Sequence, residues 1–119
     1  MQSKTILVIE DDRTIRNTIK LILELEGYKV LLAADGREGL NLLSDVPAPC
    51  LILLDLMMPV MTGWEFIEAL EADQVLMAIP VVVVTAFSEK AEKVKSERKV
   101  IKKPLEFDTL LAVANEYCR

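Results

Sequence analysis

The chain has no histidine and only two cysteines, Cys50 and Cys118, which lie 68 residues apart. Without imidazole or a CxxC spacing, a metal site built on nitrogen or thiolate ligands is not expected. Cys50 opens an apolar run, so we expect it to be a buried bystander, because free cysteine commonly packs as a small hydrophobic residue. No apolar stretch approaches the ~20 residues of a membrane helix, and the first residues have no signal-peptide core. These absences predict a cytoplasmic protein without a membrane segment.

Positive charge is also scarce. The 119 residues carry 14 Lys and Arg against 19 Asp and Glu, a net charge of -5, which argues against nucleic acid or a membrane surface as the main partner. Seven of the basic residues gather between Ser88 and Lys103. That stretch is either a solvated helix face or a docking surface for an acidic partner. At 52% hydrophobic, residues 1–119 are expected to form one domain with one core.

Strand-like and helix-like segments alternate five times along the chain. The expected strands cover residues 5–9, 28–33, 51–55, 81–85 and 99–102, and the expected helices cover residues 13–26, 35–47, 62–70, 88–97 and 107–118. Two helix starts have the capping-box pattern, at Asp35 and at Thr62. Five such units predict an α/β fold with a parallel sheet, right-handed crossovers and helices on both faces.

The apolar run of residues 50–54 ends at a single carboxylate, Asp55. Ligands of open α/β sheets bind at the carboxyl ends of the strands. The polar residues found at these ends are Glu10, Asp11, Asp12, Asp55, Thr85 and Lys103. Carboxylates without His or Cys favour a hard cation such as Mg²⁺, while a hydroxyl and an ammonium suit a phosphoryl group. Asp55 is therefore the candidate nucleophile for an acyl phosphate.

These residues and their spacing resemble the response-regulator receiver domain of two-component signalling, over essentially the whole chain. The resemblance rests on Ile6-Leu7-Val8-Ile9-Glu10-Asp11-Asp12, on Asp55-Leu56-Met57-Met58-Pro59 with Gly63 four residues later, on Val84-Thr85-Ala86, and on Lys103-Pro104. It implies a flavodoxin-like (βα)5 three-layer sandwich with a five-stranded parallel sheet in the order 2-1-3-4-5.

The resemblance also implies a Mg²⁺ or Mn²⁺ site. Asp11 is selected as a direct ligand because Arg16 follows it by five residues, and Glu10 is then its partner through water. The other implied ligands are Asp55 and the backbone carbonyl of Met57.

By the same resemblance, Asp55 is the phosphoacceptor, and Thr85 and Lys103 bind the phosphoryl oxygens. The bond between Lys103 and Pro104 is a candidate cis peptide. Asp12, just before the first helix, is expected to be its N-cap.

Two departures fall between Thr85 and Lys103. That interval is 18 residues, which predicts a fourth helix shortened by about one turn. The switch aromatic of the family, three residues before the lysine, is replaced by Val100, and a valine cannot act as a swinging ring. We therefore hypothesise that phosphorylation is retained while its coupling to the output face is weakened or rerouted.

Two positions that could tune hydrolysis of the phosphoryl group are apolar. Met57 and Phe87 lie two residues beyond Asp55 and Thr85, and neither can orient an attacking water. We expect slow autodephosphorylation.

The expected function is therefore that of a phosphoacceptor receiver, which accepts a phosphoryl group from a histidine kinase or a histidine phosphotransfer protein. It catalyses only its own phosphorylation and dephosphorylation, and signals by contact with a downstream protein that could dock on residues 88–118. The alternative is a pseudo-receiver, an interaction module that phosphate does not switch. Because the chain ends one helix after Lys103, we expect either a stand-alone receiver or an excised domain.

Overall fold

The computed structural model describes residues 4–86 and 99–118. The strands are β1 (Thr5–Ile9), β2 (Lys29–Ala33), β3 (Leu51–Leu54), β4 (Val81–Thr85) and β5 (Lys99–Lys102). The helices are α1 (Arg13–Leu25), α2 (Gly36–Asp45), α3 (Gly63–Glu71) and α5 (Phe107–Tyr117), with a short 3-10 helix, η1 (Leu76–Ala78), before β4. All strand pairs are parallel and the order is β2-β1-β3-β4-β5, which confirms the predicted fold.

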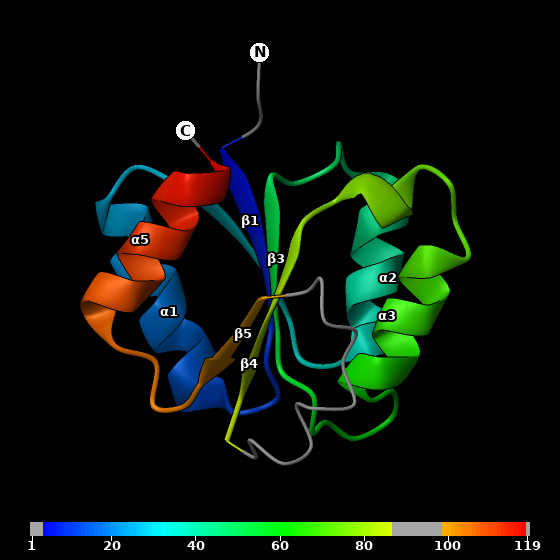
Figure 1. Ribbon diagram of the computed structural model, residues 1–119, viewed down its shortest axis with the longest axis horizontal. Coiled ribbons are helices and arrows are strands. Elements are labelled where there is room, and N and C mark those ends of the chain that lie inside the picture. Colours follow the sequence, from blue (N-terminus) through cyan, green and yellow to red (C-terminus); the bar gives the residue numbers. More distant parts are fainter. Residues whose placement is uncertain (1–3, 87–98, 119) are drawn as a thin grey trace.

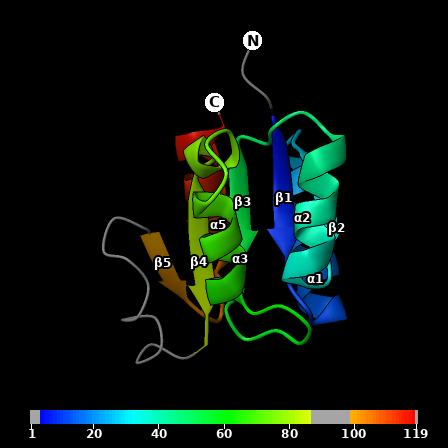
Figure 2. The same cartoon turned by 90° about the vertical axis from the view of Figure 1, so that its right-hand side faces the viewer.

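The sheet is the middle layer of three. Helices α1 and α5 cover one face and α2 and α3 cover the other, as Figure 1 shows with the sheet seen nearly edge-on. Figure 2, turned by 90°, shows α2 and α3 lying in front of the strands. The expected helix at residues 88–97 lies outside the described residues.

Alternation along the strands divides the core between the two faces. In β1, Ile6 and Val8 pack with α1 and α5, while Leu7 and Ile9 pack with α2 and α3. The central strands are apolar on both sides because both faces are covered by helices. Every residue of β3 and β4 is buried, so a polar side chain at the end of either strand has a fixed backbone.

Side-chain caps begin three helices where the sequence predicted them. Asp12 accepts a hydrogen bond from the Ile15 amide at the start of α1, which confirms it as the N-cap. Asp35 caps α2, and Thr62 with Glu65 forms a full capping box at α3. These caps set the helix starts directly after the strand-end loops.

The prediction for the cysteines is wrong. Cys50 and Cys118 form a disulfide, with 5.4 Å between their Cα atoms. The reason lies in the topology: each helix runs back antiparallel to the strands, so α5 ends at the sheet edge where β3 begins. Neither periodicity nor local spacing signals this contact across 68 residues.

Candidate functional site

The site lies at the carboxyl edge of the three central strands. Asp55 directly follows β3, and its amide donates to the Ile9 carbonyl at the end of β1, 3.0 Å away. Thr85 ends β4, and the Lys103 amide donates to the Thr85 carbonyl at 2.8 Å. These two hydrogen bonds continue the parallel pairing of the strands by one residue. The side chains of Asp55, Thr85 and Lys103 therefore lie at the same edge of the sheet.

Three carboxylates meet at this edge. One carboxylate oxygen from each of Glu10, Asp11 and Asp55 lies within 4.8 Å of the other two. Glu10 and Asp55 are only 3% and 6% exposed, whereas Asp11 is exposed. The three side chains offer only oxygen ligands, which fits a hard cation.

The surroundings of Asp55 disfavour the ionised form of its carboxyl group. Burial, and then repulsion from Glu10, raise the pKa of its carboxyl from 3.8 to about 7, against the opposing attraction of Lys103. A carboxylate in this position costs free energy when it is ionised without further positive charge nearby. The cluster is therefore chemically suited to bind a cation.

Lys103 is the cation of the cluster that the chain itself supplies. Its Nζ lies 2.6 Å from Glu10 Oε1 and 3.6 Å from Asp55 Oδ2. Burial lowers the pKa of Lys103, but the hydrogen bond to Glu10 and the attraction of Asp55 outweigh it, so the pKa lies above its usual value. Local sequence pattern does not predict the ion pair between Lys103 and Glu10, because the two residues are 93 positions apart.

Arg16 binds the backbone next to the acidic residues that follow β1. Its guanidinium donates to the backbone carbonyls of Glu10 at 2.9 Å and Asp11 at 3.4 Å. Asp12 turns away to cap α1, while its amide donates to Glu10 Oε2 at 3.2 Å. These hydrogen bonds fix the backbone that follows β1. The carboxylates of Glu10 and Asp11 lie close to that of Asp55, whereas the carboxylate of Asp12 caps α1.

The loop between Asp55 and α3 is packed against the site. Gly63 donates its amide to the Leu56 carbonyl at 2.9 Å, and a Cβ atom at Gly63 would meet the Asp55 carbonyl oxygen at 2.6 Å. Val60 has a φ of 67°, which β-branched residues rarely adopt. Met57 is 39% exposed, and the role of its carbonyl stays a prediction.

Three further positions were predicted from the sequence: the Lys103–Pro104 bond, Val100 and Phe87. The Lys103–Pro104 peptide bond is cis. Val100 is 38% exposed on β5, and Phe87 lies outside the described residues. Within residues 4–86 and 99–118, no helix is both long and apolar enough to cross a membrane.

Comparisons with known proteins agree with this geometry. A family model described as "Response regulator receiver domain" matches residues 6–115. The chain is 38% identical over 93 residues to the phosphate regulon transcriptional regulatory protein PhoB of Klebsiella pneumoniae, covering 78% of this chain and 40% of that protein. It is also 38% identical over 89 residues to the transcriptional regulatory protein CpxR of Escherichia coli, covering 75% of this chain and 36% of that protein. The chain thus spans about two fifths of these curated relatives.

The chain is also similar to solved structures of receiver domains and response regulators over nearly its full length. The chemotaxis response regulator CheY4 of Vibrio cholerae superposes with a TM-score of 0.87 at 30% identity, covering 98% of this chain and 99% of that one. The signal receiver domain of a histidine kinase from Syntrophus aciditrophicus superposes with a TM-score of 0.85 at 29% identity, covering 96% and 89%.

Proposed function

Because the chain belongs to the family of response regulator receiver domains, we propose that it accepts a phosphoryl group on Asp55 and signals through the resulting change in protein contacts. The proposal rests on three features that lie at the same edge of the sheet. They are the acidic triad of Glu10, Asp11 and Asp55, the buried hydroxyl-bearing residue Thr85, and the ammonium group of Lys103, which is 3.6 Å from Asp55. A phosphoacceptor, a cation site and anion-binding groups all lie there.

The acidic triad is proposed to hold Mg²⁺ or Mn²⁺. Asp11 and Asp55 are the direct carboxylate ligands in this proposal, the Met57 carbonyl is a third, and Glu10 takes part through water. The donor set fits, since every donor is oxygen. Burial, and then repulsion from Glu10, raise the pKa of Asp55, so a cation beside it would favour the ionised carboxylate. When bound, the ion supplies positive charge that offsets the charge of the transferring phosphoryl oxygens.

In the transfer, a carboxylate oxygen of Asp55 attacks phosphorus. The bond between phosphorus and the donor's histidine nitrogen breaks, and a bond between phosphorus and the Asp55 oxygen forms, giving an acyl phosphate. Lys103 then exchanges part of its contact with Glu10 for a phosphoryl oxygen, and the Thr85 hydroxyl donates to another. Both groups stabilise charge on the phosphoryl group and hold its orientation.

The proposed donor is a histidine kinase or a histidine phosphotransfer protein, and the proposed place of work is the cytoplasm. The chain catalyses only its own phosphorylation and dephosphorylation. Since the side chain of Met57 is apolar and cannot orient an attacking water, the acyl phosphate is expected to hydrolyse slowly. Val100 offers no ring to report phosphorylation, so weakened or rerouted coupling to the output face remains part of the proposal.

The test is incubation with acetyl phosphate and Mg²⁺, followed by intact mass measurement. We expect the gain of one phosphoryl group in the wild-type chain, none in Asp55→Asn, and none when EDTA replaces Mg²⁺. The exposed carboxylate variant Asp45→Asn, on α2, serves as the matched control and should be phosphorylated as the wild type is. A wild-type chain that gains no mass would instead identify a pseudo-receiver.

A further inference from the structure

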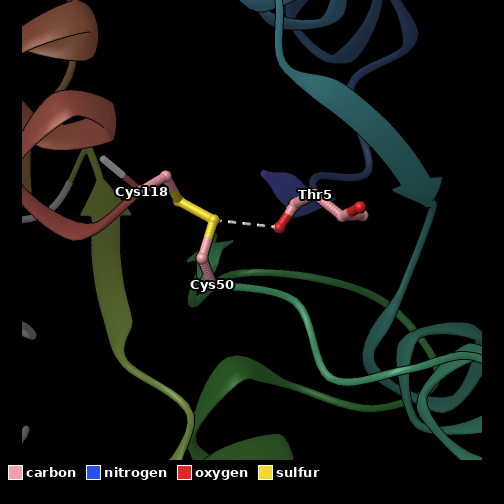
Figure 3. The surroundings of a disulfide bond; sticks show 3 residues. All are labelled: Thr5, Cys50 and Cys118. Carbon is pink, nitrogen blue, oxygen red and sulfur yellow. Dashed lines mark hydrogen bonds between the residues drawn. A yellow bond between two sulfur atoms is a disulfide. The ribbon is translucent and has the colours of Figure 1, made fainter. Parts of the chain in front are cut away.

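The disulfide ties the end of the last helix to the start of the central strand. Cys118 is the C-cap residue of α5 and Cys50 directly precedes β3, as Figure 3 shows in close-up. Asp55 directly follows the same strand, five residues after Cys50. At about 3.3 Å per residue, the disulfide and the phosphoacceptor lie roughly 16 Å apart along one buried strand.

The folded chain has a place for both thiols in their reduced form. The Cys50 sulfur lies 3.2 Å from the Thr5 carbonyl oxygen (Figure 3), which also accepts a hydrogen bond from the Cys50 amide at 2.9 Å, so a reduced Cys50 thiol lies within hydrogen-bonding distance of this oxygen. Cys118 is 1% exposed and packs in the apolar layer between the sheet and α1 and α5, where a thiol behaves as a small hydrophobic group. A core of this size does not depend on a disulfide to form.

Within one chain, oxidation of this pair has one possible disulfide as its product. The chain contains no other cysteine, so oxidation cannot produce a different intramolecular pairing. Of the two sulfurs, Cys50 belongs to the more exposed residue, since it is half-buried while Cys118 is buried. An external thiolate therefore reaches Cys50 first.

We propose that Cys50 and Cys118 form a reversible thiol–disulfide site, opened by a dithiol reductant and closed by a small disulfide oxidant. In the opening reaction, one thiolate of the reductant attacks the Cys50 sulfur, the Cys50–Cys118 bond breaks, and the Cys118 thiolate leaves and takes up a proton. The second thiol of the reductant then displaces Cys50. Two electrons pass from the dithiol, which becomes a disulfide, to the pair, which becomes two thiols. In a reducing compartment such a bond is transient, as a redox-sensing bond should be.

The state of the pair decides how firmly the last turn of α5 is held. The Cys118 amide donates to the Ala114 carbonyl at 2.8 Å, and the contact between Lys99 and Glu116 at 3.2 Å is exposed, so it adds little. Helix ends fray unless tertiary contacts hold them. The oxidised pair clamps this turn to the sheet with a covalent bond. Reduction leaves the turn held only by noncovalent contacts such as the packing of Ala114, Tyr117 and Cys118, while the carboxyl edge with Asp55 is left intact.

Hydrogen exchange on the oxidised and the reduced protein tests the clamp without any phosphorylation. We expect the backbone amides of Asn115 to Cys118 to exchange more than tenfold faster after reduction, with the amides of β1 and β3 unchanged. Cys50→Ser is the matched control, because its hydroxyl can still donate to the Thr5 carbonyl. Its amides should exchange as fast as those of the reduced wild type, both with and without reductant. Equal exchange in the two states, or a bond that a millimolar dithiol reduces only when the protein is unfolded, would overturn the proposal.

A second measurement connects the clamp to signalling, and this part rests on the proposed function. Amide chemical shifts are compared with and without beryllofluoride and Mg²⁺, a mimic of the phosphoryl group, in each redox state. We expect shift changes around Asp55 to be equal in both states and changes along α5 to be at least twofold larger in the reduced state. Equal α5 changes would refute the gating role. No change around Asp55 in either state would refute the proposed function and the gating together, while the exchange result on the clamp would stand.

Discussion

Replacing Asp55 by asparagine should make the protein without metal more stable, although it removes the proposed phosphoacceptor. The change keeps the shape of the side chain and removes a charge that burial and Glu10 oppose, as the pKa of about 7 records. The unfolded chain ionises the same carboxyl near 3.8. Folding therefore has to hold a proton on Asp55, or accept an unfavourable charge there.

The sign and the pH window follow from proton linkage. Between pH 3.8 and about 7 the folded state binds more protons at Asp55 than the unfolded state does, so this residue lowers the free energy of unfolding as pH rises through that interval. A difference of about three pKa units corresponds to ~4 kcal/mol at pH 8, at 1.36 kcal/mol per unit. The pKa of about 7 already includes the opposing attraction of Lys103, 3.6 Å away. Because solvent at the edge of the sheet screens part of the charge, we expect a net gain of roughly 2–4 kcal/mol at pH 8 that shrinks toward zero near pH 4.

Urea unfolding in EDTA at several pH values between 4 and 8 measures this difference, with the disulfide kept oxidised in all samples. Asp45→Asn makes the same chemical change at an exposed site and should alter the free energy of unfolding by less than about 0.5 kcal/mol at every pH. Adding Mg²⁺ should stabilise the wild type and narrow its gap to Asp55→Asn. A variant no more stable than the wild type at pH 8, or a gain independent of pH, would refute the electrostatic account of the site.

Three further predictions concern the segment from the end of β3 to the first residue of α3. Gly63→Ala should lower the free energy of unfolding by roughly 1–3 kcal/mol and slow phosphorylation by acetyl phosphate, because its Cβ would meet the Asp55 carbonyl oxygen at 2.6 Å; urea unfolding and intact mass check the two effects. Val60→Asn should stabilise the protein by roughly 0.5–1 kcal/mol, since asparagine tolerates the positive φ of 67° better than valine, and an unchanged urea midpoint would contradict this. Met57→Asn should speed hydrolysis of the acyl phosphate by giving a water molecule a polar partner, which the decay of the phosphorylated mass over time would reveal.

The sequence was a reliable guide wherever local pattern decides structure. Continuous β-branched runs such as Val81–Thr85 specify strands covered on both faces, and polar residues such as Asp12 and Thr62 specify helix starts, because capping needs only neighbours within one turn. The gathering of Asp55, Glu10 and Lys103 at one edge was also predictable, since parallel strands place their carboxyl ends together. The expected helix at 88–97 lies outside the described residues, so that part of the prediction stays open.

What the sequence by itself determined is the alternation of strands and helices, and with it the edge at which the acidic residues and the lysine collect. The tertiary structure alone decided the contacts between residues distant in the chain. It paired Lys103 with Glu10 at 2.6 Å, pressed Gly63 against the backbone of Asp55, and joined Cys50 to Cys118. The physical reason is that period and capping act within a few residues, whereas burial, charge compensation and disulfide formation depend on which surfaces the packed helices bring together.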